Sequence, residues 1–276
     1  MSTRHVRESI IILMLLASSA FAQTPARTLL DDGYRNMYNL QFAQAHDAFD
    51  RWQKMHPDDP LGPASDAASY LFAEFDRLHV LESELFVQDS RFEKRPKNSA
   101  DPQVKRLFDA DLAKSKEICD RILARDPNNA NALFASAMVE GLRGDYLSLI
   151  EKRDMAALSN MKTGRAIAEK LLAAHPDYYD AYLAVGVENY LLSLKPAPMR
   201  WLLRVTGAQT DRAAGLEKLK ITAEKGHYLQ PYARLLLAVA ALRDGNRSQA
   251  DQLLSGLANE FPNNHLYALE LAKLQH

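Results

Sequence analysis

The stretch QPYARLLLAVAALRDGNRSQADQLLSGLANEFPNN, residues 230–264, decides the fold predicted for this chain. It predicts two short amphipathic helices, because each half carries apolar side chains at the three- and four-residue spacings of a helix. Neither helix is able to bury its apolar face alone, so the hairpin needs a neighbour on each side. The apolar positions are Leu235, Leu236, Ala238, Val239 and Leu242 in the first half, and Ala250, Leu253, Leu254 and Leu257 in the second.

Turn signals separate the two helices and end the second. Gly245 is suited to the left-handed position after a helix, and Asn246 is suited to cap the next helix together with Gln249. A Phe-Pro-Asn-Asn corner, residues 261–264, closes the unit. The stretch therefore indicates a helical hairpin that stacks in an array.

The composition agrees with a folded helical chain. It has 276 residues, 47% of them apolar, with 11 glycines and 12 prolines, so we expect a buried core rather than disorder. The formal charge of −1 gives no electrostatic basis for binding nucleic acid. The one cysteine, Cys119, excludes an intrachain disulfide, and its position between Ile118 and Ile122 predicts a small buried side chain.

The first 22 residues predict a signal peptide. Arg4 and Arg7 precede an apolar run, residues 10–17, and Ala20-Phe21-Ala22 matches a cleavage site. Cleavage after Ala22 leaves residues 23–276 as a single mature domain, which we expect in the periplasm or outside the cell. The alternative is an uncleaved membrane anchor, but the apolar run is far shorter than the roughly 20 residues that span a bilayer.

Four proline corners punctuate the rest of the chain, at residues 55–58, 125–128, 174–177 and 260–263. Each proline disfavours helix at the residue before it, and the Asp or Asn that follows is suited to cap the next helix. We therefore expect Asn128 to begin a helix. The corners stand at unequal intervals, which predicts an irregular array with insertions.

Counting back from Pro57 gives Phe49, Ala45, Phe42 and Gly33, an alternation of large and small residues. With the corners, this pattern resembles tetratricopeptide-repeat (TPR) proteins over most of residues 27–274. The resemblance implies an all-α fold, a right-handed α-solenoid of TPR-like hairpins with irregular repeats and about eleven helices. Besides 230–243 and 247–260, the expected helices are 27–39, 42–55, 64–90, 102–125, 129–152, 154–174, 177–195, 211–225 and 263–274. We expect a bend or break in the helix 129–152 near Gly141 and Gly144.

A second resemblance covers about residues 186–240. The run from Tyr190 to Pro196, then Gly207, Asp211-Arg212 and Gly215-Leu216, resembles the TPR-like inclusion-body-clearance family and uncharacterised exported bacterial TPR proteins. The chain departs from the pattern at residues 209–210, where glycine is expected. This resemblance implies a non-enzymatic adaptor and carries over no catalytic residue.

No pattern for catalysis, cofactor binding or metal binding stands out. His79 and Glu82 share a helix face, but Glu84 points away, so we expect solvated side chains rather than a metal site. His56 and His175 both precede a corner proline, which favours a role at helix ends. Phosphate-binding loops and hydrolase signatures are absent from the sequence. We predict that the protein is not an enzyme.

The leading hypothesis is a scaffold that binds a protein or peptide partner in a concave groove formed by the first helices of successive hairpins. Two alternatives stay open: a carbohydrate-active hydrolase of the cell envelope, and a helical protein that contacts a membrane surface through residues 196–206. The predicted partner-binding residues are Tyr70, Tyr178, Tyr182, Asn189 and Tyr190, with a lip of Arg200, Trp201 and Arg204.

Overall fold

The structure is a computed structural model that describes residues 27–80, 87–194 and 209–274. Within these ranges the chain is all-helical, with twelve α-helices and no strand, close to the eleven helices predicted. The predicted signal peptide, residues 1–22, lies outside the described residues. The helices are α1 (Leu29–Tyr38), α2 (Phe42–Met55), α3 (Leu61–Arg77), α5 (Asp89–Lys94), α6 (Pro102–Leu123), α7 (Ala130–Asp145), α8 (Asp154–Ala174), α9 (Tyr182–Ser193), α11 (Arg212–Lys225), α12 (Gln230–Arg243), α13 (Arg247–Glu260) and α14 (His265–Leu274).

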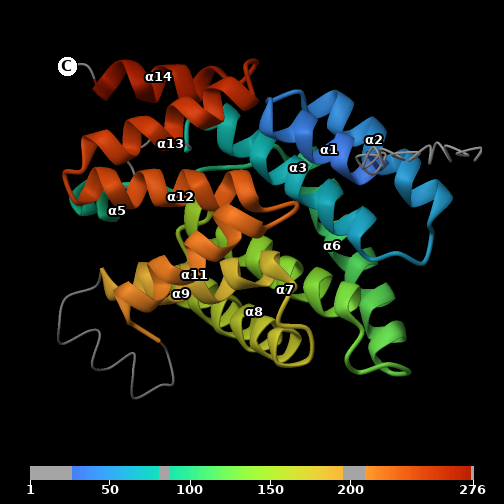
Figure 1. The fold of residues 1–276 in the computed structure, drawn as a ribbon. Helices are drawn as coiled ribbons and strands as arrows, with labels where there is room; N and C mark the ends of the chain where they lie inside the picture. Colours follow the sequence, from blue (N-terminus) through green and yellow to red (C-terminus); the bar gives the residue numbers. More distant parts are fainter. Residues whose placement is uncertain (1–26, 81–86, 195–208, 275–276) are drawn as a thin grey trace, which may run out of the picture.

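Helices that follow one another in the chain pack side by side. The series runs α1, α2, α3, α6, α7, α8, α9, α11, α12, α13 and α14, each helix against the next (Figure 1). Helix α3 lies at the centre, because it also contacts α1 and α7, and its first nine residues are all buried. The two long connections, after α3 and after α9, interrupt the series of hairpins as the unequal corner intervals predicted.

The α12–α13 hairpin confirms the predicted turn. Gly245 has a φ of 71°, a left-handed conformation that favours glycine, and the Asn246 side chain accepts a hydrogen bond from the Gln249 backbone N–H at 3.1 Å. The buried face of α12 differs from the prediction, because helices lie on more than one side of it. Its fully buried residues are mainly small, while Leu235, Leu236, Val239 and Leu242 are only partly buried.

At three of the four corners, the side chain that bonds the start of the next helix lies one residue later than predicted. Asp59 accepts a hydrogen bond from the backbone N–H of Leu61, and Asn264 accepts one from that of Leu266. At the second corner Asn129 caps α7, so the prediction of Asn128 as the cap was wrong. At the third corner a 3-10 turn precedes α9, and no side chain caps that helix.

The first hairpin confirms the predicted pairing of small and large residues. A Cβ atom added at Gly33 would lie 2.2 Å from Cε1 of Phe49, so only glycine allows α1 and α2 to approach this closely. The same close approach occurs between α9 and α11, where a Cβ atom at Gly215 would lie 2.6 Å from the backbone N of Tyr190.

The prediction of one long helix over residues 64–90 was wrong. Helix α3 ends at Arg77, and His79 takes a φ of 55° in the turn that follows. The chain then continues through residues 81–86, outside the described ranges, to the short α5. The expected break near Gly144 is present, because α7 gives way to a π-helical turn, η1 (Tyr146–Ile150).

Candidate functional site

The predicted partner-binding residues lie in separate parts of the fold. Tyr70 lies on α3, Tyr178 and Tyr182 flank the 3-10 turn η2 (Tyr179–Ala181), and Asn189 and Tyr190 lie within α9. The predicted lip, Arg200, Trp201 and Arg204, lies outside the described residues.

Tyr178 and Tyr182 are half-buried and lie just after the third proline corner. The Tyr178 ring packs against Phe134 with 5.0 Å between ring centroids, and its hydroxyl donates to Oδ1 of Asn131 at 3.4 Å. The Tyr182 hydroxyl donates to the Pro176 carbonyl at 3.1 Å. Burial, reinforced by nearby Asp180, raises the pKa of the Tyr178 hydroxyl, so this group acts as a neutral donor at physiological pH.

An open hollow adjoins Tyr178. We call it the corner hollow: it has a volume of about 440 Å³ and is lined by the first corner, the end of α6 and the start of α7. Asn131, which lines the hollow, is the residue that Tyr178 contacts, so the hollow and this tyrosine form one continuous surface. The lining residues are His56, Pro57, Asp58, Asp59, Pro60, Ile122, Asn129 and Asn131.

The walls of the corner hollow are held in place by local bonds. Asp59 accepts hydrogen bonds from Nε1 of Trp52 and from the Leu61 backbone, both at 3.0 Å. Asp58, by contrast, is exposed and its ion pair with Arg121 is also exposed. The hollow therefore combines a rigid rim with an acidic group and amide groups that are accessible to solvent.

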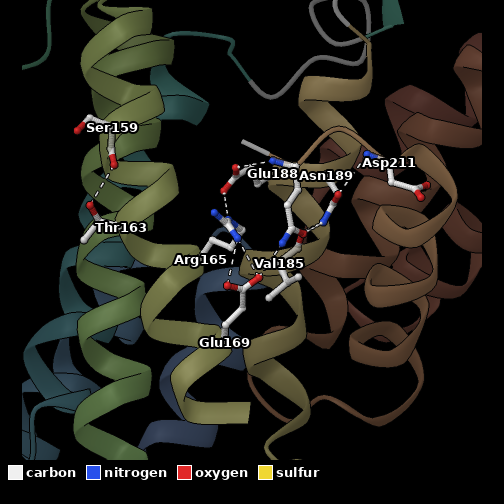
Figure 2. Close-up of polar contacts among 9 residues, drawn as sticks. Ser159, Thr163, Arg165, Glu169, Val185, Glu188, Asn189 and Asp211 are labelled. Carbon is white, nitrogen blue, oxygen red and sulfur yellow. Dashed lines mark hydrogen bonds and ion pairs between the residues drawn. The ribbon is translucent and has the colours of Figure 1, made fainter. Parts of the chain in front are cut away.

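Asn189 and Tyr190 are buried and take part in internal contacts. Asn189 donates to the Val185 carbonyl at 3.2 Å and to Oε1 of Gln209 at 2.6 Å, and its own Oδ1 accepts from the Asp211 backbone N–H at 3.2 Å (Figure 2). In this way Asn189 fixes the chain as it enters α11. A partner at the surface would not touch it.

A buried ion pair lies beside Asn189. The Arg165 guanidinium on α8 donates through Nε to Oε2 of Glu188 on α9 at 2.7 Å, and through Nη1 to Glu169 at 2.9 Å (Figure 2). Glu188 is fully buried, and its other oxygen accepts the Gln209 backbone N–H at 3.3 Å. Sequence reasoning missed this pair, although a glutamate within the apolar run from residue 183 to 192 was a usable signal.

Tyr70 belongs to a cluster of titratable groups between α2, α3 and α6. Its ring lies 4.0 Å from the His46 ring, and Nδ1 of His46 contacts the buried carboxylate of Asp66. Burial, together with the negative charge of Asp66, raises the pKa of Asp111 on α6 to about 7. A raised carboxyl pKa beside a histidine–carboxylate pair is one feature of groups that act in general acid–base chemistry.

Among the described residues, no group of three His, Cys, Asp or Glu side chains converges as a metal site requires. His79 lies in the turn after α3, while Glu82 and Glu84 fall outside the described residues. Cys119 is fully buried, as predicted, and burial raises the pKa of its thiol.

Among the described residues, no helix is both long enough and apolar enough to cross a membrane. Comparison of the chain with known proteins adds no assignment: no model of a protein family matches it, and no curated protein matches it.

Proposed function

We propose that this protein is an exported, TPR-like α-solenoid that binds a protein or peptide partner and carries no chemistry of its own. The series of helical hairpins supports the architecture, because stacked hairpins of this kind are built to offer extended binding surfaces. The signal pattern in residues 1–22 supports export to the periplasm or beyond, and a membrane contact through residues 196–206 stays part of the proposal.

The observation that carries this function is the corner hollow with Tyr178 on its border. Its volume of about 440 Å³ is of the size that accommodates several side chains or a short extended segment. The hollow favours a positively charged partner segment that is rich in hydrogen-bond donors. This preference follows from the exposed carboxylate of Asp58 and the side-chain amides of Asn129 and Asn131.

Capture from an envelope extract tests the proposal. The mature chain, residues 23–276, is immobilised beside an Asn131→Arg variant, which fills the corner hollow, and a Ser159→Arg variant, which places the same side chain on exposed α8. We expect a captured protein to be lost from Asn131→Arg and retained by Ser159→Arg. Titration of that purified protein then measures the loss in affinity. If Asn131→Arg retains every captured protein at wild-type affinity, the hollow is not the binding site.

The cluster at Asp66 and Asp111 supports one second candidate, a hydrolase that acts on envelope carbohydrate. Its basis is the contact of His46 with Asp66, together with burial that raises the pKa of Asp111 to about 7, because a glycosidase needs one carboxyl group with a raised pKa. Hydrolysis of cell-wall oligosaccharides by wild type, and its loss in both Asp66→Asn and Asp111→Asn, would establish this activity. Absence of hydrolysis by wild type would leave the scaffold function as the proposal.

A further inference from the structure

The described part of the insertion between α3 and α6, residues 87–100, is fixed to one end of the array. The Asn98 backbone N–H donates to the Ile150 carbonyl of η1 at 2.9 Å. On the other side, Nη1 of Arg243, the last residue of α12, donates to the Val87 carbonyl at 3.4 Å. Helix α5 therefore lies at the end of the array where α7 and α12 both end (Figure 1).

A buried arginine anchors the insertion against the start of α8. The Arg95 side chain is only 3% exposed, and its guanidinium lies 3.8 Å from the centre of the Phe92 ring. Its Nη2 donates to the Ser148 carbonyl at 3.1 Å and contacts the carboxylate of Asp154. In return, Nζ of Lys152 donates to the Arg95 carbonyl at 2.8 Å. These bonds place the residues around Arg95 beside the first turn of α8.

Three positively charged side chains of the insertion are exposed. They are Arg91, Lys94 and Lys97, and none of the three forms an ion pair among the described residues. Residues 87–100 carry four basic and two acidic side chains, so their net charge is +2, whereas the whole chain carries −1. The insertion therefore concentrates positive charge at this end of the array.

An exposed methionine lies beside these cations. Met155, next to Asp154 in the first turn of α8, is 79% exposed, more than any other large apolar side chain among the described residues. Because Arg95 contacts Asp154, Met155 and the cations of the insertion belong to one surface. Arg153, whose side chain is 62% exposed, adds a further positive charge. We call this surface the basic patch: Arg91, Lys94, Lys97, Arg153 and Met155.

The basic patch and the corner hollow lie at opposite ends of α7. Asn131, in the first turn of α7, lines the hollow, and η1, which follows α7, holds the insertion through Ile150. A helix of 16 residues is about 24 Å long. A broad surface that contacts the basic patch therefore leaves the corner hollow accessible.

We propose that the basic patch binds the protein to an anionic phospholipid surface. The exposed ammonium and guanidinium groups meet the headgroup phosphates, and the flexible Met155 side chain enters the boundary between headgroups and acyl chains. Nucleic acid offers no apolar layer for a methionine, and a folded protein partner requires a larger apolar centre than one side chain supplies. This inference rests neither on the corner hollow nor on residues 196–206.

Flotation of the mature chain with vesicles tests the proposal. Vesicles of phosphatidylethanolamine and phosphatidylglycerol are compared with vesicles of phosphatidylcholine alone. We expect wild type to bind the anionic vesicles and not the neutral ones, and we expect this binding to weaken as salt is raised, because salt screens exposed charges.

The variant Arg91→Gln/Lys94→Gln/Lys97→Gln removes three charges of the basic patch and leaves residues 196–206 intact. Each Lys or Arg near an anionic membrane surface strengthens binding roughly fivefold, so this variant should bind the anionic vesicles roughly 100-fold more weakly than wild type. Met155→Ser should also weaken binding but leave its salt dependence unchanged, because no charge is lost. Helical circular dichroism verifies that both variants are folded.

The matched control is Lys54→Gln/Arg125→Gln/Lys170→Gln. It removes the same charge from exposed residues near the ends of α2, α6 and α8, away from the basic patch, and should bind as wild type does. Equal binding by the two triple variants would overturn the proposal. Flotation of wild type with neither kind of vesicle, or equally with both, would also overturn it. The capture experiment depends on Asn131, at the other end of α7, so either proposal is able to fail alone.

Discussion

The ion pair between Arg165 and Glu188 gives the sharpest prediction about stability. Glu188 has no exposed side-chain surface, and the Arg165 side chain is 13% exposed. Replacing Arg165 by methionine keeps most of the side-chain volume but leaves the Glu188 carboxylate buried, where the Gln209 N–H still donates to it. A buried charge without its counterion is costly, since desolvation is no longer offset by attraction.

The expected cost of Arg165→Met is about 3–5 kcal/mol in the free energy of unfolding. Glu188→Gln should cost less, about 1–2 kcal/mol, because glutamine still accepts hydrogen bonds and Arg165 keeps its pair with Glu169. The double variant Arg165→Met/Glu188→Gln should recover most of the loss, because no buried charge remains. Arg121→Met is the matched control, since its pair with Asp58 is exposed and should be worth at most about 1 kcal/mol.

Urea unfolding followed by helical circular dichroism measures these four variants against wild type. The midpoint and slope together show whether stability alone has changed. The reasoning fails if Arg165→Met costs no more than Arg121→Met. It fails equally if the double variant is as unstable as Arg165→Met alone, because the loss would then come from packing and not from the unpaired charge.

Three further substitutions test close packing and charge. Gly215→Ala should destabilise the protein by about 1–3 kcal/mol, because the added Cβ would lie 2.6 Å from the Tyr190 backbone N. Gly256→Ala should instead stabilise the protein by up to about 1 kcal/mol, because its added Cβ meets open space. Thermal unfolding of both variants measures this difference. The raised pKa of Asp111 means that the folded chain binds more protons than the unfolded chain between about pH 4 and 7, so its contribution to stability falls as pH rises through that window. The stability of Asp111→Asn relative to wild type should therefore increase from pH 4 to pH 7 and stay constant above pH 7. A difference in urea midpoints that does not change with pH would contradict this prediction.

Local sequence signals predicted most of the helices. Residues 42–55, 154–174 and 230–243 form helices over the predicted ranges, because apolar periodicity, prolines and caps agree there. The end of α3 at Arg77 was not predicted, because the apolar pattern continues past it. His79 takes a left-handed conformation in the turn, and the sequence does not indicate this because the residue there is not glycine. Periodicity reports which face is apolar and not where a helix ends.

The candidate site was less predictable, since it depends on contacts between distant segments. Position within a helix indicated that Tyr178, Asn189 and Tyr190 face a groove, but the neighbours of α9 decide which of them are exposed. Asn189 and Tyr190 are covered by the approach of α11, which Gly215 permits. The corner hollow joins segments about 70 residues apart, and no local pattern encodes that distance.

The requirement that builds the array also explains why its last helices contact its first. A two-helix hairpin is too small to bury its apolar face, so each hairpin covers its predecessor, and the first would be left with an uncovered inner face. Tyr34 and Tyr38 of α1 are almost fully buried because Tyr228 and Phe261, more than 180 residues later, cover them. Closing a chain over so many residues costs only slightly more than closing a shorter loop, so the burial of these aromatic rings is able to offset it. The burial of these rings therefore depends on both ends of the helical series.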